Sequence, residues 1–223
     1  MSLWSTLGDV EFSTGKIYKD VRDLSPGAGR VVAPNPGSLL AHLTASSDMT
    51  GSEIAMKMRI SEATLENSNG GIDATFGSLI SRTISAAAGE KITFNWNFVE
   101  RDYGEFNDWS FFGVSFNEGP STVSRLASVM EVGPIEDLNS EESTVNGWKT
   151  FEYEMAAAGN YTFHFGVVNA FDGRASSELW VDAPQAGIST IPEPGSVLGL
   201  GLLLGSGLFV RSRRRLTVQQ KSV

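Results

Sequence analysis

Apolar and polar residues alternate along several segments of the first 182 residues. The alternating segments are 54–60, 92–98, 151–155 and 161–167, and the shorter apolar runs 111–116, 122–130 and 178–182 also resemble strands. A period of two places one face of a strand on a core and the other face in water. Many short strands with turn residues between them, and no long amphipathic helix, predict an all-β body over 1–182, a β-sandwich or jelly roll.

Two stretches of the body resemble each other. Each carries Ala-Ala-Ala-Gly immediately before an aromatic strand, at 86–89 and at 156–159. We interpret them as equivalent connections into two core strands, in which glycine supplies an unusual backbone angle. Gene duplication is the alternative explanation.

The chain ends in a breaker, an apolar run and a basic cluster. The breaker is Pro192-Glu193-Pro194, the run of 16 uncharged residues is 195–210, and the cluster is Arg211, Arg213, Arg214 and Arg215. A membrane-spanning helix needs about 20 residues, with about 17 as the lower limit, so this would be a short anchor. The positive-inside rule places the arginines in the cytoplasm and the body outside it. A buried core helix is the alternative, which the terminal arginines disfavour.

This order of motif, apolar helix and arginines resembles the PEP-CTERM sorting signal of Gram-negative bacteria, over 191–215. The resemblance implies a linker at 183–190, a transmembrane helix at 195–210 and a cytoplasmic end at 216–223. It also implies that an exosortase processes the chain at Pro192-Glu193-Pro194. The expected route leads from a transient inner-membrane anchor to the cell surface or the exopolysaccharide matrix. The body is also similar, more loosely, to ectodomains that precede such tails and resemble carbohydrate-binding jelly rolls.

An exported protein needs a signal peptide with a basic start and an apolar core of about 7–15 residues. Residues 1–23 carry scattered charges and no such core. We therefore expect an upstream start that encodes the export signal.

Charge is divided unevenly along the chain. All 26 acidic residues precede Gly195, whereas five of the 17 basic residues follow it. The resulting acidic body argues against nucleic acid as a partner, because phosphate is repelled by such a surface. The chain has no cysteine, which excludes disulfides, thiolate catalysis and cysteine-based zinc sites.

The richest cluster of polar residues is the predicted loop 100–108. Asp102, Glu105, Asn107 and Asp108 could supply several of the six to eight oxygens that Ca²⁺ takes. Their spacing does not match an EF-hand. The alternative is a solvated turn whose side chains cap their own backbone.

A second candidate carboxylate is Asp182, at the end of the last predicted strand. It could join Asp172, or a carboxylate near the first strand such as Asp9 or Glu11, in holding Ca²⁺. The alternative for Asp182 is a turn before Pro184. For Asp172, which precedes Gly173, the alternative is a hairpin turn.

Two tryptophans are candidates for stacking on a sugar ring. Trp180 is out of phase with Leu179 and Val181 and is predicted to face outward, and Trp109 follows the acidic loop. The alternative is that these rings cover the edge of the core. Trp96, in contrast, is in phase with the apolar face of its strand.

No motif in the chain indicates catalysis, and we expect no enzyme activity. His42 and His164 are far apart in sequence, and no serine lies in a Gly-x-Ser-x-Gly elbow. The sequence favours a structural or adhesive protein of the exopolysaccharide layer. The alternative is a carbohydrate-binding module assisted by Ca²⁺.

Overall fold

The computed structural model describes residues 4–17, 19–20, 30–32, 39–46, 49–102, 104–132, 142–145 and 147–182. Residues Met1–Ser189 form one compact unit. The second unit, Thr190–Val223, lies wholly outside the described residues, and so do the predicted sorting motif, membrane segment and arginine cluster. None of the described helices has the length and apolar composition needed to cross a membrane.

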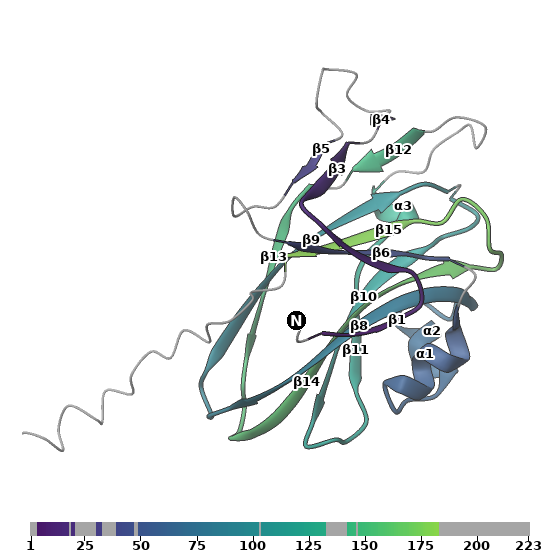
Figure 1. The fold of residues 1–223 in the computed structure, drawn as a ribbon. Coiled ribbons are helices and arrows are strands. Elements are labelled where there is room, and N and C mark those ends of the chain that lie inside the picture. Colours follow the sequence, from purple (N-terminus) through teal and green to yellow (C-terminus); the bar gives the residue numbers. More distant parts are fainter. Residues whose placement is uncertain are drawn as a thin grey trace, which may run out of the picture. The chain divides into compact units, whose positions relative to one another are not determined.

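The described residues form two large β-sheets, drawn in Figure 1. The first sheet has the order β1 (Ser5–Leu7), β8 (Ala74–Ala86), β14 (Gly159–Ala170), β10 (Trp109–Phe116) and β11 (Thr122–Ser128), with β7 (Met49–Thr50) also on β8. The second has the order β2 (Val10–Ser13), β6 (Leu40–Thr44), β15 (Glu178–Asp182), β9 (Lys91–Glu100), β12 (Glu142–Val145) and β4 (Lys19–Asp20), with β13 (Lys149–Glu154) also on β9. A separate pair joins β3 (Gly15–Ile17) to β5 (Arg30–Val32). All pairings are antiparallel except that of β12 with β4.

Aromatic side chains from both sheets meet in the main core. Phe94 of β9 lies 4.9 Å from Phe165 of β14 and 6.3 Å from Phe112 of β10, measured between ring centroids. The same core buries Trp96, as its phase in the sequence predicts. The predicted β-sandwich is thereby confirmed, whereas the finer assignment as a jelly roll stays a prediction.

The predicted strand 54–60 is wrong, because Gly51–Lys57 is a helix, α1. Thr50 and Glu53 form a capping box that starts the helix. Ile54, Ala55 and Met58 then share its buried face, while Met56 is 72 % exposed. The even spacing of the four large apolar residues therefore imitates a strand. The run 122–130 also ends earlier than predicted, since α3 (Val129–Val132) follows β11.

Helices α1 and α2 (Glu62–Asn67) cover part of the outer face of the first sheet (Figure 1). Their apolar residues pack on Leu79, Trp109, Phe111 and Val168 in a second core. The first residue of α1 lies very close to the first residue of β8, because a Cβ added to Gly51 would lie 2.0 Å from the carbonyl oxygen of Ala74. This covering leaves the remainder of the outer face open.

The two Ala-Ala-Ala-Gly turns lie side by side at one end of the sandwich. The N–H of Gly89 donates to the carbonyl of Met155, and the N–H of Met155 donates to that of Glu90, both at 2.8 Å. One turn leads into β9 and the other into β14, so their interpretation as equivalent connections into core strands is confirmed.

Candidate functional site

The outer face of the first sheet changes from apolar to polar where α1 ends. On β8, Leu79 packs under the helices, and the next outward positions are Ser81 and Thr83. On β14, Val168 packs under the helices, and the outward positions beyond it include His164 and Thr162. The inward positions of both strands are mostly apolar and face the main core, although those of β8 also include Ser78 and Arg82. The part of the outer face that the helices leave uncovered is therefore mainly polar.

Side chains on this face pair across the two central strands. The hydroxyl of Ser81 lies 2.7 Å from Nδ1 of His164, and the hydroxyls of Thr83 and Thr162 lie 2.8 Å apart. Farther out, the hydroxyl of Ser85 donates to the side-chain carbonyl of Asn160. The register adds Ser5 of β1 opposite Ser81 and Ser115 of β10 opposite Thr162. The result is a floor of hydroxyls around one imidazole that crosses four strands.

A hollow of about 460 Å³ lies over this floor, and we call it the polar groove. Its floor residues are Ser5, Ser81, Thr83, Ser115, Thr162 and His164. Its rim is formed by Lys57, Met58 and Arg59 at the end of α1, and by Glu118 and Gly119 of the β10–β11 turn. The volume falls within the roughly 300–1,000 Å³ of small-molecule sites, but the lining is far more polar than such sites usually are.

Two rim residues have left-handed backbone conformations that usually belong to glycine. Arg59 has φ 57° and follows the C-cap of α1, where the N–H groups of Arg59 and Ile60 donate to the carbonyls of Met56 and Ala55. This pattern is a Schellman motif, whose left-handed position is usually glycine. Glu118 has φ 61° at the second central position of a tight hairpin turn, which also favours glycine.

Arg59 and Glu118 bind each other across the rim. Nη1 of Arg59 donates to the carbonyl oxygen of Glu118, and Nη2 lies 3.5 Å from its carboxylate. A side chain in a left-handed conformation costs about 1 kcal/mol or more, and such strain concentrates at functional sites. Two strained residues, from separate elements and both on the rim, thus mark the polar groove as the candidate site.

The imidazole on the floor is neutral at physiological pH. Burial, together with the ammonium group of Lys57, lowers the pKa of His164 to about 4. A neutral imidazole and the hydroxyls beside it each offer both a donor and an acceptor. The floor therefore suits a ligand whose own hydrogen-bonding groups also act in both roles.

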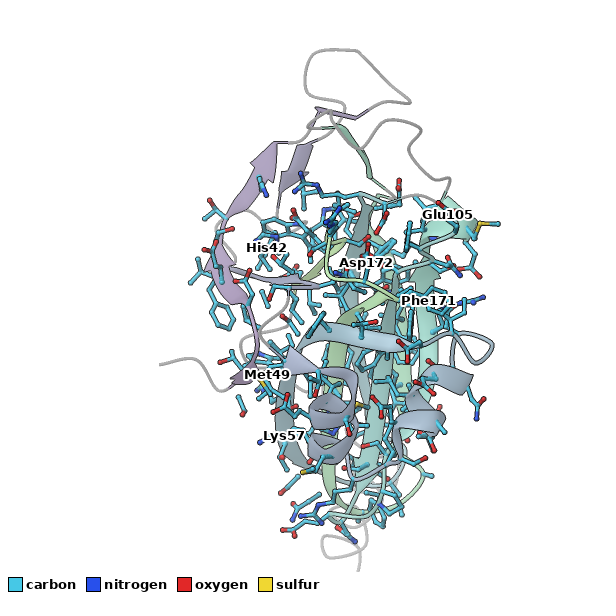
Figure 2. All side chains as sticks on the ribbon, turned by 90° about the vertical axis from the view of Figure 1, so that its right-hand side faces the viewer. His42, Met49, Lys57, Glu105, Phe171 and Asp172 are labelled. Carbon is cyan, nitrogen blue, oxygen red and sulfur yellow. The ribbon has the colours of Figure 1, made fainter. Side chains whose placement is uncertain are left out.

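A second, more apolar hollow adjoins the polar groove, and we call it the methionine pocket. Its volume is about 410 Å³; Leu7, Met49 and Met56 supply its apolar lining, and Glu53 adds a carboxylate. Lys57 and Arg59 line both hollows, so the two meet at the end of α1. Figure 2 shows Lys57 and Met49 close to each other, beside the helices.

The acidic loop, predicted as a calcium site, lies elsewhere. In Figure 2, Glu105 lies toward the upper end of this view, away from Lys57. Asp102 and Asp108 are both buried and interact electrostatically, whereas Glu105 is exposed. Burial raises the pKa of Asp108 well above its usual value, although its carboxylate accepts hydrogen bonds from the N–H groups of Ala170 and Ser177.

The carbonyl oxygens that Ca²⁺ would need are also engaged by the protein. Oδ1 of Asn107 accepts from the N–H of Met130 at 2.9 Å. In the part of the chain that the structure describes, no three His, Asp or Glu side chains are grouped to hold a metal ion. Calcium binding therefore stays a prediction from the sequence, and the described residues offer no such group of ligands for it.

The second set of predicted carboxylates is dispersed. Asp182 lies opposite Asn95 of β9. Asp182 and Glu178 are four residues apart on β15, a separation of about 13 Å at the rise of a strand. Glu11 lies opposite His42 and Asp9 precedes β2, so neither is opposite Asp182. Oδ1 of Asp172 accepts from the N–H of Arg174, which forms a turn within its own loop.

The expected exposure of the two tryptophans is wrong. Trp109 is 0 % exposed because the helices pack over it, and Trp180 is 1 % exposed. Trp180 does point away from Leu179 and Val181, but it packs with Val31, Leu40 and Val99 in a third core. In this structure neither ring is accessible for stacking on a sugar.

The structure shows a buried ion-pair cluster that the sequence analysis missed. The carboxylate of Glu178 forms ion pairs with Lys16 Nζ and Arg101 Nη1, each at 3.2 Å. It also lies 2.5 Å from Nε2 of His42. His42 stacks on Trp180 with 4.0 Å between ring centroids. These contacts compensate the charge of the buried carboxylate and link residues that are far apart in the sequence.

No protein-family model and no curated protein matches this chain. Among solved structures, it is similar to TmCBM61 in complex with β-1,4-galactotriose, at 14 % identity and a TM-score of 0.38 over 80 % of this chain and 83 % of that one. It is also similar to the K3 cleaved adhesin domain of Lys-gingipain from Porphyromonas gingivalis, at 8 % identity and a TM-score of 0.37 over 82 % and 89 %. The xylan-binding domain of CBM 22 matches at 11 % identity and a TM-score of 0.29 over 81 % and 83 %. With TM-scores below 0.5, these likenesses carry no ligand and no site over to this chain.

Proposed function

We propose that the body is a carbohydrate-binding module and that the polar groove is its binding site. The observation that carries the proposal is the hydroxyl and imidazole floor beside the strained Arg59–Glu118 pair. A sugar ring presents hydroxyls that both donate and accept, as do the floor residues. The planar guanidinium group of Arg59 adds a donor fork at the rim.

The test is glycan-array screening of the full-length protein in neutral detergent, followed by calorimetric titration of the best ligand. The double variant T83V/T162V removes the central pair of hydroxyls while keeping the shape of both side chains. Because both partners become apolar together, no unpaired group is left and the fold is expected to tolerate the change. We expect affinity to fall at least tenfold.

The matched control is T93V, at an exposed threonine of β9 on the other sheet, which we expect to bind like the parent protein. Absence of any glycan ligand would remove the proposed function. Unchanged binding by T83V/T162V would show that the site lies elsewhere.

We further propose that the chain is exported, processed at Pro192-Glu193-Pro194 by an exosortase and displayed at the surface or in the exopolysaccharide matrix. The motif, the apolar run and the four arginines support this route. Replacing the three motif residues (Pro192→Ala, Glu193→Ala and Pro194→Ala) should trap the unprocessed protein in the inner membrane. Cell fractionation with intact-mass measurement checks this, and an unchanged shorter surface form would contradict it.

A further inference from the structure

The polar groove carries an excess of one positive charge. Its rim holds Lys57, Arg59 and Glu118, and the last two neutralise each other through the contacts described above. Lys57, by contrast, forms no ion pair with any residue that the structure describes. Its positive charge is opposite in sign to the formal net charge of the protein, which is −9.

The ammonium group of Lys57 acts on the floor of the groove. Its charge contributes to the lowered pKa of His164, so the cation lies close enough to the imidazole to oppose its protonation. His164 is therefore neutral above about pH 4 and adds no second positive charge. Lys57 is the single cationic group that a ligand on this floor meets without displacing another partner among the described residues.

Lys57 also lies where the polar groove meets the methionine pocket. A ligand long enough to occupy both hollows passes over this residue. Its hydroxyls would lie on the serine and threonine floor, and the C–H face of a further ring would lie on Met49 and Met56. Methionine side chains adapt to such irregular apolar surfaces.

We infer that the ligand is an acidic oligosaccharide, and that Lys57 binds the carboxylate or sulfate ester on one of its rings. This inference rests on the proposed carbohydrate-binding function and adds to it the chemical class of the ligand. A charge-assisted hydrogen bond from an ammonium group is about twice as strong as a neutral one. Lys57 thereby selects acidic rings over neutral rings of the same shape.

The experiment compares three trisaccharides in calorimetric titrations of the full-length protein in neutral detergent. These are trigalacturonate, its full methyl ester and a sulfated trigalactose. The methyl ester keeps the rings and hydroxyls but removes the charge. We expect either acidic ligand, or both, to bind at least tenfold more tightly than the ester.

Three variants assign the preference to a residue. In K57M the ratio between acid and ester should fall close to one, and in K57R most of it should be retained. K91M is the control, because Lys91 lies on the second sheet and pairs with Glu152 at 2.8 Å. Its ratio should equal that of the parent protein.

The outcomes separate this inference from the proposed function. Equal binding of acids and ester overturns the inference but leaves carbohydrate binding intact, whereas no binding of these trisaccharides or of any arrayed glycan overturns both. A ratio that survives in K57M, or one that K91M also loses, overturns the assignment to Lys57. A ratio lost in K57M alone supports it.

Discussion

At the scale of single residues, two side chains on the rim of the polar groove have strained backbone conformations. Among the described residues other than glycine, five have positive φ angles: Arg59 and Glu118, which line the groove, and Asn117, Phe171 and Ala175, which do not. A turn or a helix end that served folding alone would be better supplied by glycine. The long side chains at these two positions are therefore explained by what they do at the rim.

Replacing the strained rim residues by glycine should separate stability from binding. In R59G and E118G the relieved backbone offsets the loss of an exposed ion pair, so unfolding free energy should stay level or rise by up to about 1 kcal/mol. Carbohydrate affinity should nevertheless fall severalfold. Urea denaturation and calorimetric titration measure the two effects.

Ala175 supplies the control for this experiment. In A175G the same relief should raise stability by about 1 kcal/mol, or roughly 2–4 °C in melting temperature, without any change in binding. Weaker folding in R59G and E118G would contradict the argument from strain. So would full binding in both variants.

The other residue-scale prediction concerns pH and His164. Its folded pKa of about 4 lies below the ordinary value of 6.5, so between these values the unfolded chain takes up a proton that the folded chain does not. Stability must therefore fall as pH falls from about 6.5 to 4, by about 3 kcal/mol in total, and then fall no further for this reason.

Urea denaturation at several pH values, in the parent protein and in H164Q, measures this contribution. Asp108 acts in the opposite direction, because its raised pKa stabilises the folded chain as pH falls. Asp108 is present in both proteins, so the difference between them isolates His164. Parallel curves for the two proteins would show that His164 does not contribute in this way.

At the scale of elements, α1 sets the boundary of the site, because it covers one part of the outer face and its last turn forms the rim. Thr50 accepts from the N–H of Glu53, and Glu53 accepts from the N–H of Thr50. T50A should therefore lower stability by about 1 kcal/mol. The control is S52A, because Ser52 is exposed and lies two residues after Thr50 in the first turn of the helix; it should have little effect on stability. Equal losses of stability in both variants would contradict the capping argument.

The sequence predicts elements well where alternation coincides with a buried face. Strands β9, β10, β13, β14 and β15 appear where the pattern predicts them. It fails at α1, because a short amphipathic helix with large residues at even spacing gives the same pattern. It also fails for Trp180, because period two reports which face a residue is on but not whether another segment covers that face.

The polar groove has no local sequence signature. Its floor residues come from four strands, and hydroxyl-bearing residues on the outer face of a sheet are common. The one available signal is that His164 alternates with the aromatic residues of its strand, and the structure places it on the opposite face from them. The positive φ angles of Arg59 and Glu118 depend on tertiary contacts, so a sequence with Arg and Glu there gives no sign of them.

At the scale of the whole molecule, net charge and local charge oppose each other. The chain has a formal net charge of −9 at pH 7, whereas the polar groove presents Lys57. Repulsion of an acidic ligand by the whole protein acts over the Debye length, about 30 Å at 0.01 M salt and 10 Å at 0.1 M. Attraction by Lys57 acts at contact and is screened much less over this range.

Affinity for an acidic trisaccharide should therefore rise, by about twofold, when salt increases from 0.01 to 0.1 M, because the long-range repulsion is screened first. A basic protein would show the opposite trend. The methyl ester should bind equally at both salt concentrations, since it has no charge.

In K57M the net charge becomes more negative, so the acidic ligand should bind more weakly at both salt concentrations and gain proportionately more from added salt. Calorimetric titrations of both ligands over this range test the balance, and an acid affinity that falls steadily from 0.01 M would show that local attraction outweighs the charge of the molecule as a whole.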